Sequence, residues 1–211
     1  MSKVILDAAH FDSKARQWDE NPVFQERARR IAEAMRAMVP LSTTMTALDY
    51  GSGTGLLSFP LRNELGFITL SDTSAGMLAV VEEKIAALGV TNMATLLADL
   101  SATSLPDARF DLIYSSMTLH HIPDTDAILT AFHAHLNPGG WLAIADLDRE
   151  DGSFHGAEVD VHHGFERDVL AERVRRAGFV EVAFRTVFEI GKEQPQGMRV
   201  YPVFIMVARR A

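Results

Sequence analysis

Short apolar runs alternate with amphipathic segments from Met45 to the end of the chain. The apolar runs cover 45–50, 67–71, 93–97, 110–115 and 141–146, and segments 56–65, 74–88, 124–136 and 166–177 between them have helical periodicity. Two further apolar runs, 179–187 and 200–207, are expected to form an antiparallel pair. Strands that alternate with helices predict an α/β fold, in which helices cover both faces of a mostly parallel sheet.

Two segments do not fit this alternation. Residues 1–40 precede the first strand and contain a helix that is expected to begin at Asn21-Pro22 and to end before Pro40. Its apolar stripe consists of Val23, Ile31, Ala34, Met35 and Met38, and its polar side is marked by Arg27, Arg29 and Arg30. Residues 147–165 are polar and rich in histidine and acids. Both segments are predicted to lie outside the sheet.

The first strand is followed at once by three alternate glycines in Asp49-Tyr50-Gly51-Ser52-Gly53-Thr54-Gly55. Glycine permits positive φ and a close approach of ligand to backbone. A dinucleotide-binding turn has a different spacing, Gly-x-Gly-x-x-Gly, and holds phosphates that a carboxylate at Asp49 would repel. No Gly-Lys-Ser/Thr sequence is present either. The loop therefore favours a nucleoside with a cationic tail.

Two more acids follow the next two strands. Asp72 lies 21 residues after Gly51, about the spacing at which a carboxylate accepts hydrogen bonds from the ribose hydroxyls in a βαβ unit. Asp99 follows the run 93–97. Acids at the carboxyl ends of successive parallel strands line the edge at which open α/β folds bind ligands.

Five segments in this order make the chain resemble a small, single-domain class I S-adenosylmethionine-dependent methyltransferase (type 11/12-like). They are the loop 49–55, Asp72, Ala98-Asp99-Leu100, Phe110–Ser115 and Leu136-Asn137-Pro138-Gly139-Gly140. The resemblance implies a Rossmann-like α/β/α sandwich with seven strands in the order 3-2-1-4-5-7-6, the last antiparallel. It also implies a domain over 41–211 that is preceded by a helical lid over 1–40.

The resemblance further implies roles for individual residues towards S-adenosylmethionine. The loop with Gly51, Ser52, Gly53 and Gly55 would pass beneath the methionine part and the ribose. Asp49 would lie near the amino group, Asp72 at the ribose diol, Asp99 at the adenine amino group and Ser115 near the methionine moiety. Other expected contacts are Thr73, Met77 and Leu100, and Phe11 and Trp18 are expected over the cofactor, where a polarisable ring suits the sulfonium. Simple packing of Phe11 and Trp18 is an equal alternative.

Histidines provide the candidates for proton transfer. His120, in Leu119-His120-His121-Ile122-Pro123-Asp124, follows the fourth strand and could act as a general base, although such a sequence also suits a structural or cofactor-side role. His163 could point inward as a substrate contact. A metal site built from His155, His162, His163 and nearby acids is weighed against a solvated lid, which is the preferred interpretation. No metal ligand is predicted.

Composition limits the choice of partner. The formal net charge is −8, which disfavours a nucleic acid substrate, and the chain has no cysteine. Neither a secretory signal nor an apolar run long enough to span a bilayer is visible, so a cytoplasmic protein without a membrane partner is expected. The leading prediction is in-line methyl transfer to a small molecule. Alternatives are a protein or tRNA methyltransferase, a non-catalytic cofactor-binding module and, more distantly, a dinucleotide oxidoreductase. The acceptor, the attacked atom and the oligomeric state are left open.

Overall fold

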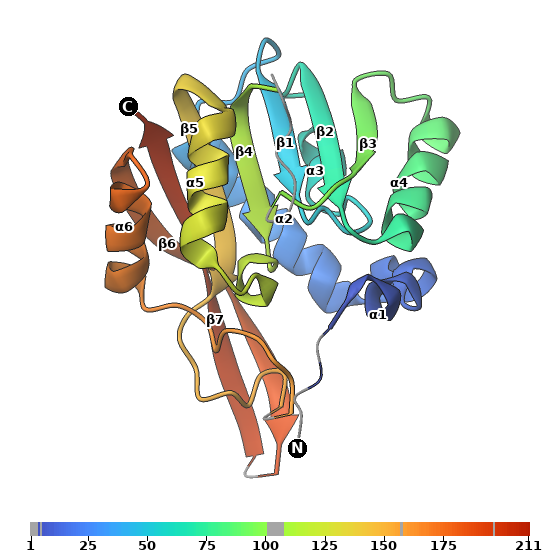
Figure 1. The fold of residues 1–211 in the computed structure, drawn as a ribbon. Coiled ribbons are helices and arrows are strands. Elements are labelled where there is room, and N and C mark those ends of the chain that lie inside the picture. Colours follow the sequence, from blue (N-terminus) through green and yellow to red (C-terminus); the bar gives the residue numbers. More distant parts are fainter. Residues whose placement is uncertain (1–3, 5, 101–107, 157, 196) are drawn as a thin grey trace.

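A seven-stranded sheet forms the centre of the molecule in a computed structural model, which describes residues 4, 6–100, 108–156, 158–195 and 197–211 (Figure 1). The strand order is β3-β2-β1-β4-β5-β7-β6, and β7 is antiparallel to both of its neighbours, whereas β1 to β5 pair in parallel. This confirms the predicted order. The strands are β1 (Thr46–Tyr50), β2 (Phe67–Asp72), β3 (Met93–Leu97), β4 (Phe110–Ser116), β5 (Leu136–Leu147), β6 (Phe179–Gln194) and β7 (Gly197–Arg210).

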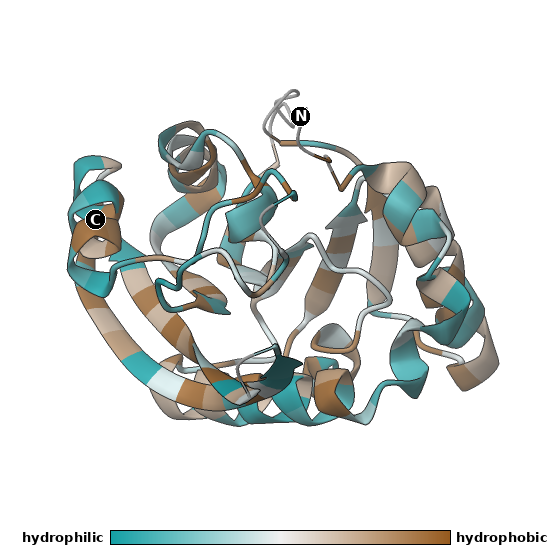
Figure 2. Cartoon of the chain, turned by 90° about the horizontal axis from the view of Figure 1, so that it is seen from below, coloured by the Kyte–Doolittle hydropathy of each residue, from teal (hydrophilic) through white to brown (hydrophobic). Residues whose placement is uncertain are grey.

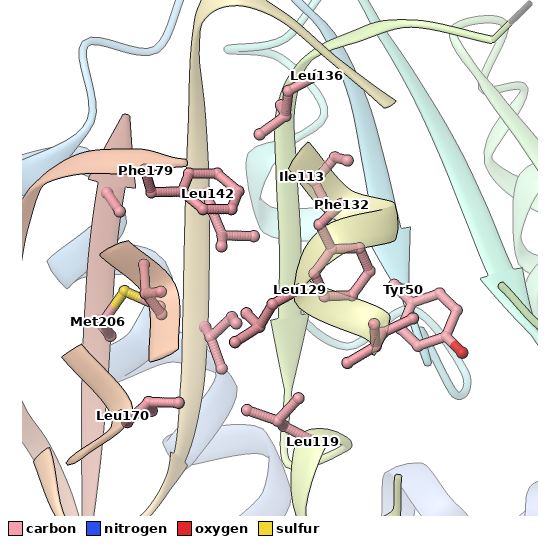
Figure 3. Close-up of a cluster of buried hydrophobic side chains, with 14 of the residues drawn as sticks. Tyr50, Ile113, Leu119, Leu129, Phe132, Leu136, Leu142, Leu170, Phe179 and Met206 are labelled. Carbon is pink, nitrogen blue, oxygen red and sulfur yellow. The ribbon is translucent and has the colours of Figure 1, made fainter. Parts of the chain in front are cut away.

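Helices pack on both faces of this sheet and make three layers. On one face, α5 and α6 bury Leu129, Phe132 and Leu170 against Ile113 and Leu142 (Figure 3). On the other face lie α2, α3 and α4, and in Figure 2 the helices carry both hydrophilic and hydrophobic residues, as amphipathic helices on a sheet do. The helical elements are α1 (Ala8–Asp12), η1 (Ala15–Glu20), α2 (Pro22–Met38), α3 (Ser58–Leu61), α4 (Ala75–Leu88), η2 (Leu119–His121), α5 (Thr125–His135) and α6 (Arg167–Arg176).

Local capping explains why the predicted helix ends are close to those observed. The Asn21 side chain accepts a hydrogen bond from the backbone N–H of Val23 at the start of α2, and Ser74 does the same for Met77 in α4. Gly89 ends α4 in the left-handed conformation with φ of +61°. These residues define helix ends through short-range hydrogen bonds, which a sequence pattern can reveal.

Four elements differ clearly from the predicted ranges. The helix expected over 56–65 is limited to Ser58–Leu61, where Pro60 has no N–H to donate. Strand β5 begins at Leu136, because the expected turn over 137–140 is a register irregularity within the β4–β5 pair. Strand β6 continues beyond residue 187, and strand β7 begins before residue 200. Together they form a long hairpin that projects from the sheet (Figure 1).

The N-terminal segment is both a cover for the sheet and a wall of the ligand cavity. Ile31 and Met35 of α2 are buried in the core on the sheet, whereas Val23, which was assigned to the apolar stripe, is 41% exposed. Arg27 was assigned to the polar side, but it lines the cavity described below. Residues 1–3 and 5 of the predicted lid are outside the described residues. Within the described part of the chain, every helix is too short or too polar to cross a bilayer.

Candidate functional site

A cavity of about 850 Å³ lies at the carboxyl edge of the parallel strands. Its walls come from the glycine loop, the end of β2, the segment after β4, the N-terminal helices, the 148–166 segment and β6. Open α/β sheets bind ligands at this edge, and the volume is within the range of small-molecule sites. The structure therefore brings the predicted loop and the two segments outside the sheet together around one cavity.

The three loop glycines have positive φ angles of +68° at Gly51, +52° at Gly53 and +79° at Gly55. A Cβ at Gly51 would overlap Thr118 at 2.3 Å, and one at Gly55 would meet the Leu70 and Phe59 side chains at 3.0 Å. A Cβ at Gly53 would find only the Trp18 Nε1 atom, at 3.9 Å. Gly51 and Gly55 are thus required by packing, whereas Gly53 keeps space open in the cavity.

Asp72 is held in place by the backbone around it. Its Oδ2 atom accepts a hydrogen bond from Gly53 N at 2.8 Å, and its Oδ1 atom accepts one from Ser74 N at 2.9 Å. Burial raises the pKa of Asp72, and these backbone N–H groups oppose that effect. Each carboxylate oxygen has a second lone pair, so Asp72 can still accept hydrogen bonds from a diol. Thr73 and Met77 line the cavity beside it.

Asp49 is a buried carboxyl group at the base of the loop, 2% exposed. The Ser58 hydroxyl donates to its Oδ2 atom at 2.6 Å, and Ser58 Oγ lies 2.5 Å from the Tyr114 hydroxyl. Burial raises the pKa of Asp49 to about 7, the Ser58 hydrogen bond opposes this, and the charge of Asp72 adds to it. Among the described residues no cationic side chain forms an ion pair with Asp49. A ligand ammonium group would supply the missing positive charge.

Three predicted cofactor residues lie behind the cavity wall. The Ser115 hydroxyl turns back to donate to the Tyr50 carbonyl at 2.7 Å, because neighbouring residues of a strand face opposite sides, and Ser116 lines the cavity instead. Leu100 is buried in the core. Gly55 also lies outside the lining. By contrast, Asp99 does line the cavity, and its Oδ1 atom accepts a hydrogen bond from the Tyr50 hydroxyl at 3.2 Å.

The N-terminal helices bring Phe11 and Trp18 to the cavity, with a distance of 6.2 Å between ring centroids. Asp12 fixes this segment to the start of α4, because its Oδ1 atom accepts hydrogen bonds from the Ser74 hydroxyl at 2.6 Å and from Gly76 N at 2.7 Å. The aromatic residues are therefore placed by polar anchors in addition to packing.

A second wall of the cavity, called the far wall below, contains imidazole rings. His120 is 1% exposed; its Nδ1 atom lies 2.7 Å from Asp146 Oδ1 and its Nε2 atom 3.0 Å from His155 Nε2. The His121 ring is 4.1 Å from the His120 ring and 5.2 Å from the His155 ring, between centroids. Burial lowers the pKa of His121 to about 2 and that of His155 to about 4, and the positive charge of neighbouring groups adds to the effect. His121 and His155 are therefore neutral near pH 7.

The 148–166 segment carries His155 into this wall. His162 N donates to the His120 carbonyl at 2.8 Å, and Val4 pairs with Val159 in a short parallel bridge. His163 is exposed and lines a separate surface depression, so the structure does not bring it to the cavity. His155 is thus the histidine of this segment that lines the cavity.

Three cationic side chains, Lys14, Arg27 and Lys192, also line the cavity, and the sequence pattern did not indicate this. Arg27 has neither a hydrogen bond nor an ion pair with a described residue, and its guanidinium lies 4.9 Å from the centre of the Phe24 ring. Burial lowers the pKa of Arg27 to about 10, and the charge of Asp146 partly offsets this. Lys192, on the extended part of β6, donates to the Phe154 carbonyl at 2.7 Å. The far wall is therefore more positive than the wall around Asp49 and Asp72.

Comparisons with known sequences relate this chain to methyltransferases. Residues 47–140 match the family described as "Methyltransferase domain". An uncharacterized methyltransferase of Mycobacterium tuberculosis is 37% identical over 108 residues, which cover 51% of this chain and 53% of that protein. The ubiquinone/menaquinone biosynthesis C-methyltransferase UbiE of Escherichia coli is 33% identical over 108 residues, 49% of this chain and 43% of that protein. The chain thus spans about half the length of these curated relatives.

A solved structure of a methyltransferase from Aquifex aeolicus, described as SAM dependent, has the same fold. It has a TM-score of 0.71 and 21% sequence identity, over 95% of this chain and 98% of that chain. The sheet order confirms the fold, and the sequence matches fall on the segment that carries the glycine loop and the acids. Residues 47–140 therefore form a methyltransferase domain of the class I, S-adenosylmethionine-dependent type.

Proposed function

We propose that this chain binds S-adenosylmethionine in the cavity and transfers its methyl group to a small-molecule acceptor. The observation that carries the proposal is the arrangement of Gly53, Asp72 and Asp49 around one open space. Gly53 leaves room above the loop, Asp72 offers acceptor lone pairs, and Asp49 is a buried carboxyl group without a cationic partner among the described residues. This combination matches a nucleoside that carries hydroxyls and an ammonium group.

The bound donor carries its methyl group on a sulfonium, which makes the methyl carbon a good electrophile. After transfer, the rest of the donor leaves as a neutral thioether. The acceptor atom forms a bond to the methyl carbon, the S–C bond breaks with its electron pair retained by sulfur, and the acceptor loses a proton. The work of the protein is then to align the two partners and to exclude water. Phe11 and Trp18, anchored through Asp12, would cover the donor.

The acceptor would occupy the space between the donor and the imidazole wall. His120 is the predicted residue for proton transfer, and Asp146 would hold its Nδ1–H so that the Nε2 lone pair faces His155. A cavity lined by Phe24, Phe154 and Ile190 in addition to Arg27 and Lys192 suits a small organic molecule with a polar group.

Calorimetry with the purified chain tests the donor site. S-adenosylmethionine and S-adenosylhomocysteine should bind, and NAD should not. The variant Asp72→Asn should weaken S-adenosylhomocysteine binding by at least about tenfold, since one lost charge-assisted hydrogen bond is worth roughly 1.5–3 kcal/mol. Asp111→Asn is the matched control, because Asp111 also accepts a backbone N–H, from Thr46 at 2.8 Å, but does not line the cavity. Binding of NAD alone, or equal affinity in the two variants, would refute the donor site.

Turnover separates an enzyme from a non-catalytic binding module. Production of S-adenosylhomocysteine should be screened over phenols, amines, thiols and quinols; the quinols are included because UbiE is named for quinone biosynthesis. An acceptor that raises turnover above the donor-only rate supports the enzyme. Tight donor binding with no turnover on any acceptor class would favour the binding module instead.

A further inference from the structure

Three histidines from two distant parts of the chain meet in the imidazole wall. His120 and His121 belong to η2, and His155 comes from the 148–166 segment. One ring nitrogen from each can be chosen so that all three lie within 4.8 Å of one another. We propose that His120, His121 and His155 bind one divalent transition-metal ion, with Zn²⁺ as the best match, on the acceptor side of the cavity.

The spacing of the ring nitrogens is close to that of a metal site. Zn–N bonds of about 2.0–2.1 Å in a tetrahedral site place two ligand nitrogens roughly 3.3 Å apart. The facing Nε2 atoms of His120 and His155 are 3.0 Å apart. The three ring nitrogens lie within 4.8 Å of one another, so binding requires the half-buried His121 and His155 rings to rotate towards a common centre. Three imidazoles with one open position form the ligand set of a catalytic rather than a structural zinc site.

Asp146 supplies the outer contact that such a site requires. This fully buried carboxylate lies 2.7 Å from His120 Nδ1 and also accepts hydrogen bonds from the backbone N–H groups of His120 and Leu147. It therefore fixes the tautomer in which His120 Nδ1 carries the proton and Nε2 has a free lone pair. A carboxylate behind a metal-binding histidine orients the ring and increases its basicity.

The alternative use of the same atoms is a hydrogen-bonded relay in which His120 acts as a base. Such a relay requires a proton on His155 Nε2, because His120 Nε2 is the acceptor once Asp146 binds Nδ1–H. The relay gives no role to His121, whose buried Nδ1 atom has no hydrogen-bond partner among the described residues. A metal ion uses all three rings, and the observations therefore favour it over the relay.

Nearby charges determine what occupies the open position of the metal. Arg27 and Lys192 line the same cavity, so a dication there requires negative charge in addition to that of Asp146. The open position then suits an anionic oxygen or sulfur atom. The next step rests on the proposed function, under which this atom belongs to the methyl acceptor. The metal lowers the pKa of the acceptor O–H or S–H group, and the proton leaves to solvent. The resulting anion attacks the methyl carbon, and the S–C bond of the donor breaks. His120 then acts as a ligand rather than as the base.

Metal titration tests the site without reference to turnover. Untagged protein is first stripped of metal with a chelator. It is then titrated with Co²⁺, and binding is measured from the visible absorption bands of four-coordinate Co²⁺. A separate titration with Zn²⁺ is measured by calorimetry. Wild type and the control His133→Asn should each bind one ion per chain; His133 lies on α5 outside the cavity. His121→Asn and His155→Asn should each bind at least about 100-fold more weakly, and Asp146→Asn about 10–100-fold more weakly.

Controls keep this result separate from the donor site. Circular dichroism and thermal melting identify a variant that fails to fold, and if His155→Asn does, His121→Asn decides the question. S-adenosylhomocysteine binding is measured in the same stripped samples: its failure would refute the proposed function and leave the metal result intact. Absence of metal binding in the folded wild type, or wild-type affinity in both histidine variants, would overturn the metal site.

Discussion

Substitution of Gly53 by alanine separates the binding role of this glycine from its backbone role. The chain offers a matched control in Gly89, which ends α4 with φ of +61°, close to the +52° of Gly53. A Cβ at Gly89 would have no atom within 4 Å, whereas a Cβ at Gly53 would project into the cavity toward Trp18 Nε1. The two substitutions therefore share the cost of a positive φ and differ in the obstruction of a ligand.

The magnitudes follow from these geometries. An alanine in the left-handed conformation costs roughly 1–2 kcal/mol. In a chain of this size each kcal/mol lowers Tm by roughly 2–4 °C, so both Gly53→Ala and Gly89→Ala should lower Tm by about 2–8 °C. Gly53→Ala should in addition weaken S-adenosylhomocysteine binding by at least about tenfold, or ~1.4 kcal/mol, because the methyl group occupies space beside the ligand.

Differential scanning fluorimetry and calorimetry on the two variants measure both quantities. The expected result is a similar Tm for the two free proteins, wild-type affinity in Gly89→Ala and reduced affinity in Gly53→Ala. Equal affinity for S-adenosylhomocysteine in the two variants would show that the space at Gly53 is not part of the donor site. A much lower Tm for Gly53→Ala alone would show that packing of the loop had been underestimated.

Three further predictions follow from the same structure. Because burial raises the pKa of Asp49 to about 7, the protonated carboxyl adds stability that is complete below pH ~4 and disappears as pH rises through 7. Urea unfolding should show this decline, on the order of 4 kcal/mol at most, and Asp49→Asn should abolish it. Gly51→Ala should melt well below Gly89→Ala, since its Cβ overlaps Thr118 at 2.3 Å; equal Tm values would contradict this contact. Arg27→Gln should raise Tm relative to wild type, because it removes a desolvated charge that no described residue pairs with, and a lower Tm would indicate a missing partner.

Sequence reasoning predicted the strands and the glycine loop because their signals are local. A strand, an acid and alternate glycines occupy consecutive positions from Thr46 to Gly55, and capping residues such as Ser74 mark helix ends a few residues away. Period and spacing are visible within such short windows. The strand order, which the family resemblance implied, was confirmed, whereas the predicted length of α3 was wrong. Pro60, which has no N–H to donate, lies in the middle of the range expected to be helical.

Residues on the far wall could not be predicted in this way. Arg27 lies on a helix with two exposed arginines, Arg29 and Arg30, that pair with Glu26, and the spacing alone does not show which arginine faces a cavity. His155 lies 35 residues from His120, in a segment without a regular pattern. Only the tertiary fold joins them, so the histidine set that was weighed in the sequence, His155, His162 and His163, differs from the one assembled in space.

The two sides of the cavity therefore depend on different parts of the chain. Gly53 and Asp72 are positioned by strands and backbone hydrogen bonds of the sheet edge, so the donor side needs little beyond the parallel strands. The imidazole wall, which we propose faces the acceptor, forms where the 148–166 segment packs on η2, through the hydrogen bond from His162 N to the His120 carbonyl. A relative that retains the glycine loop but changes this segment would keep its methyl donor and change its acceptor. The family match covers residues 47–140 and so falls on the proposed donor side; we propose that His155, Arg27 and Lys192, which lie outside it, select the acceptor.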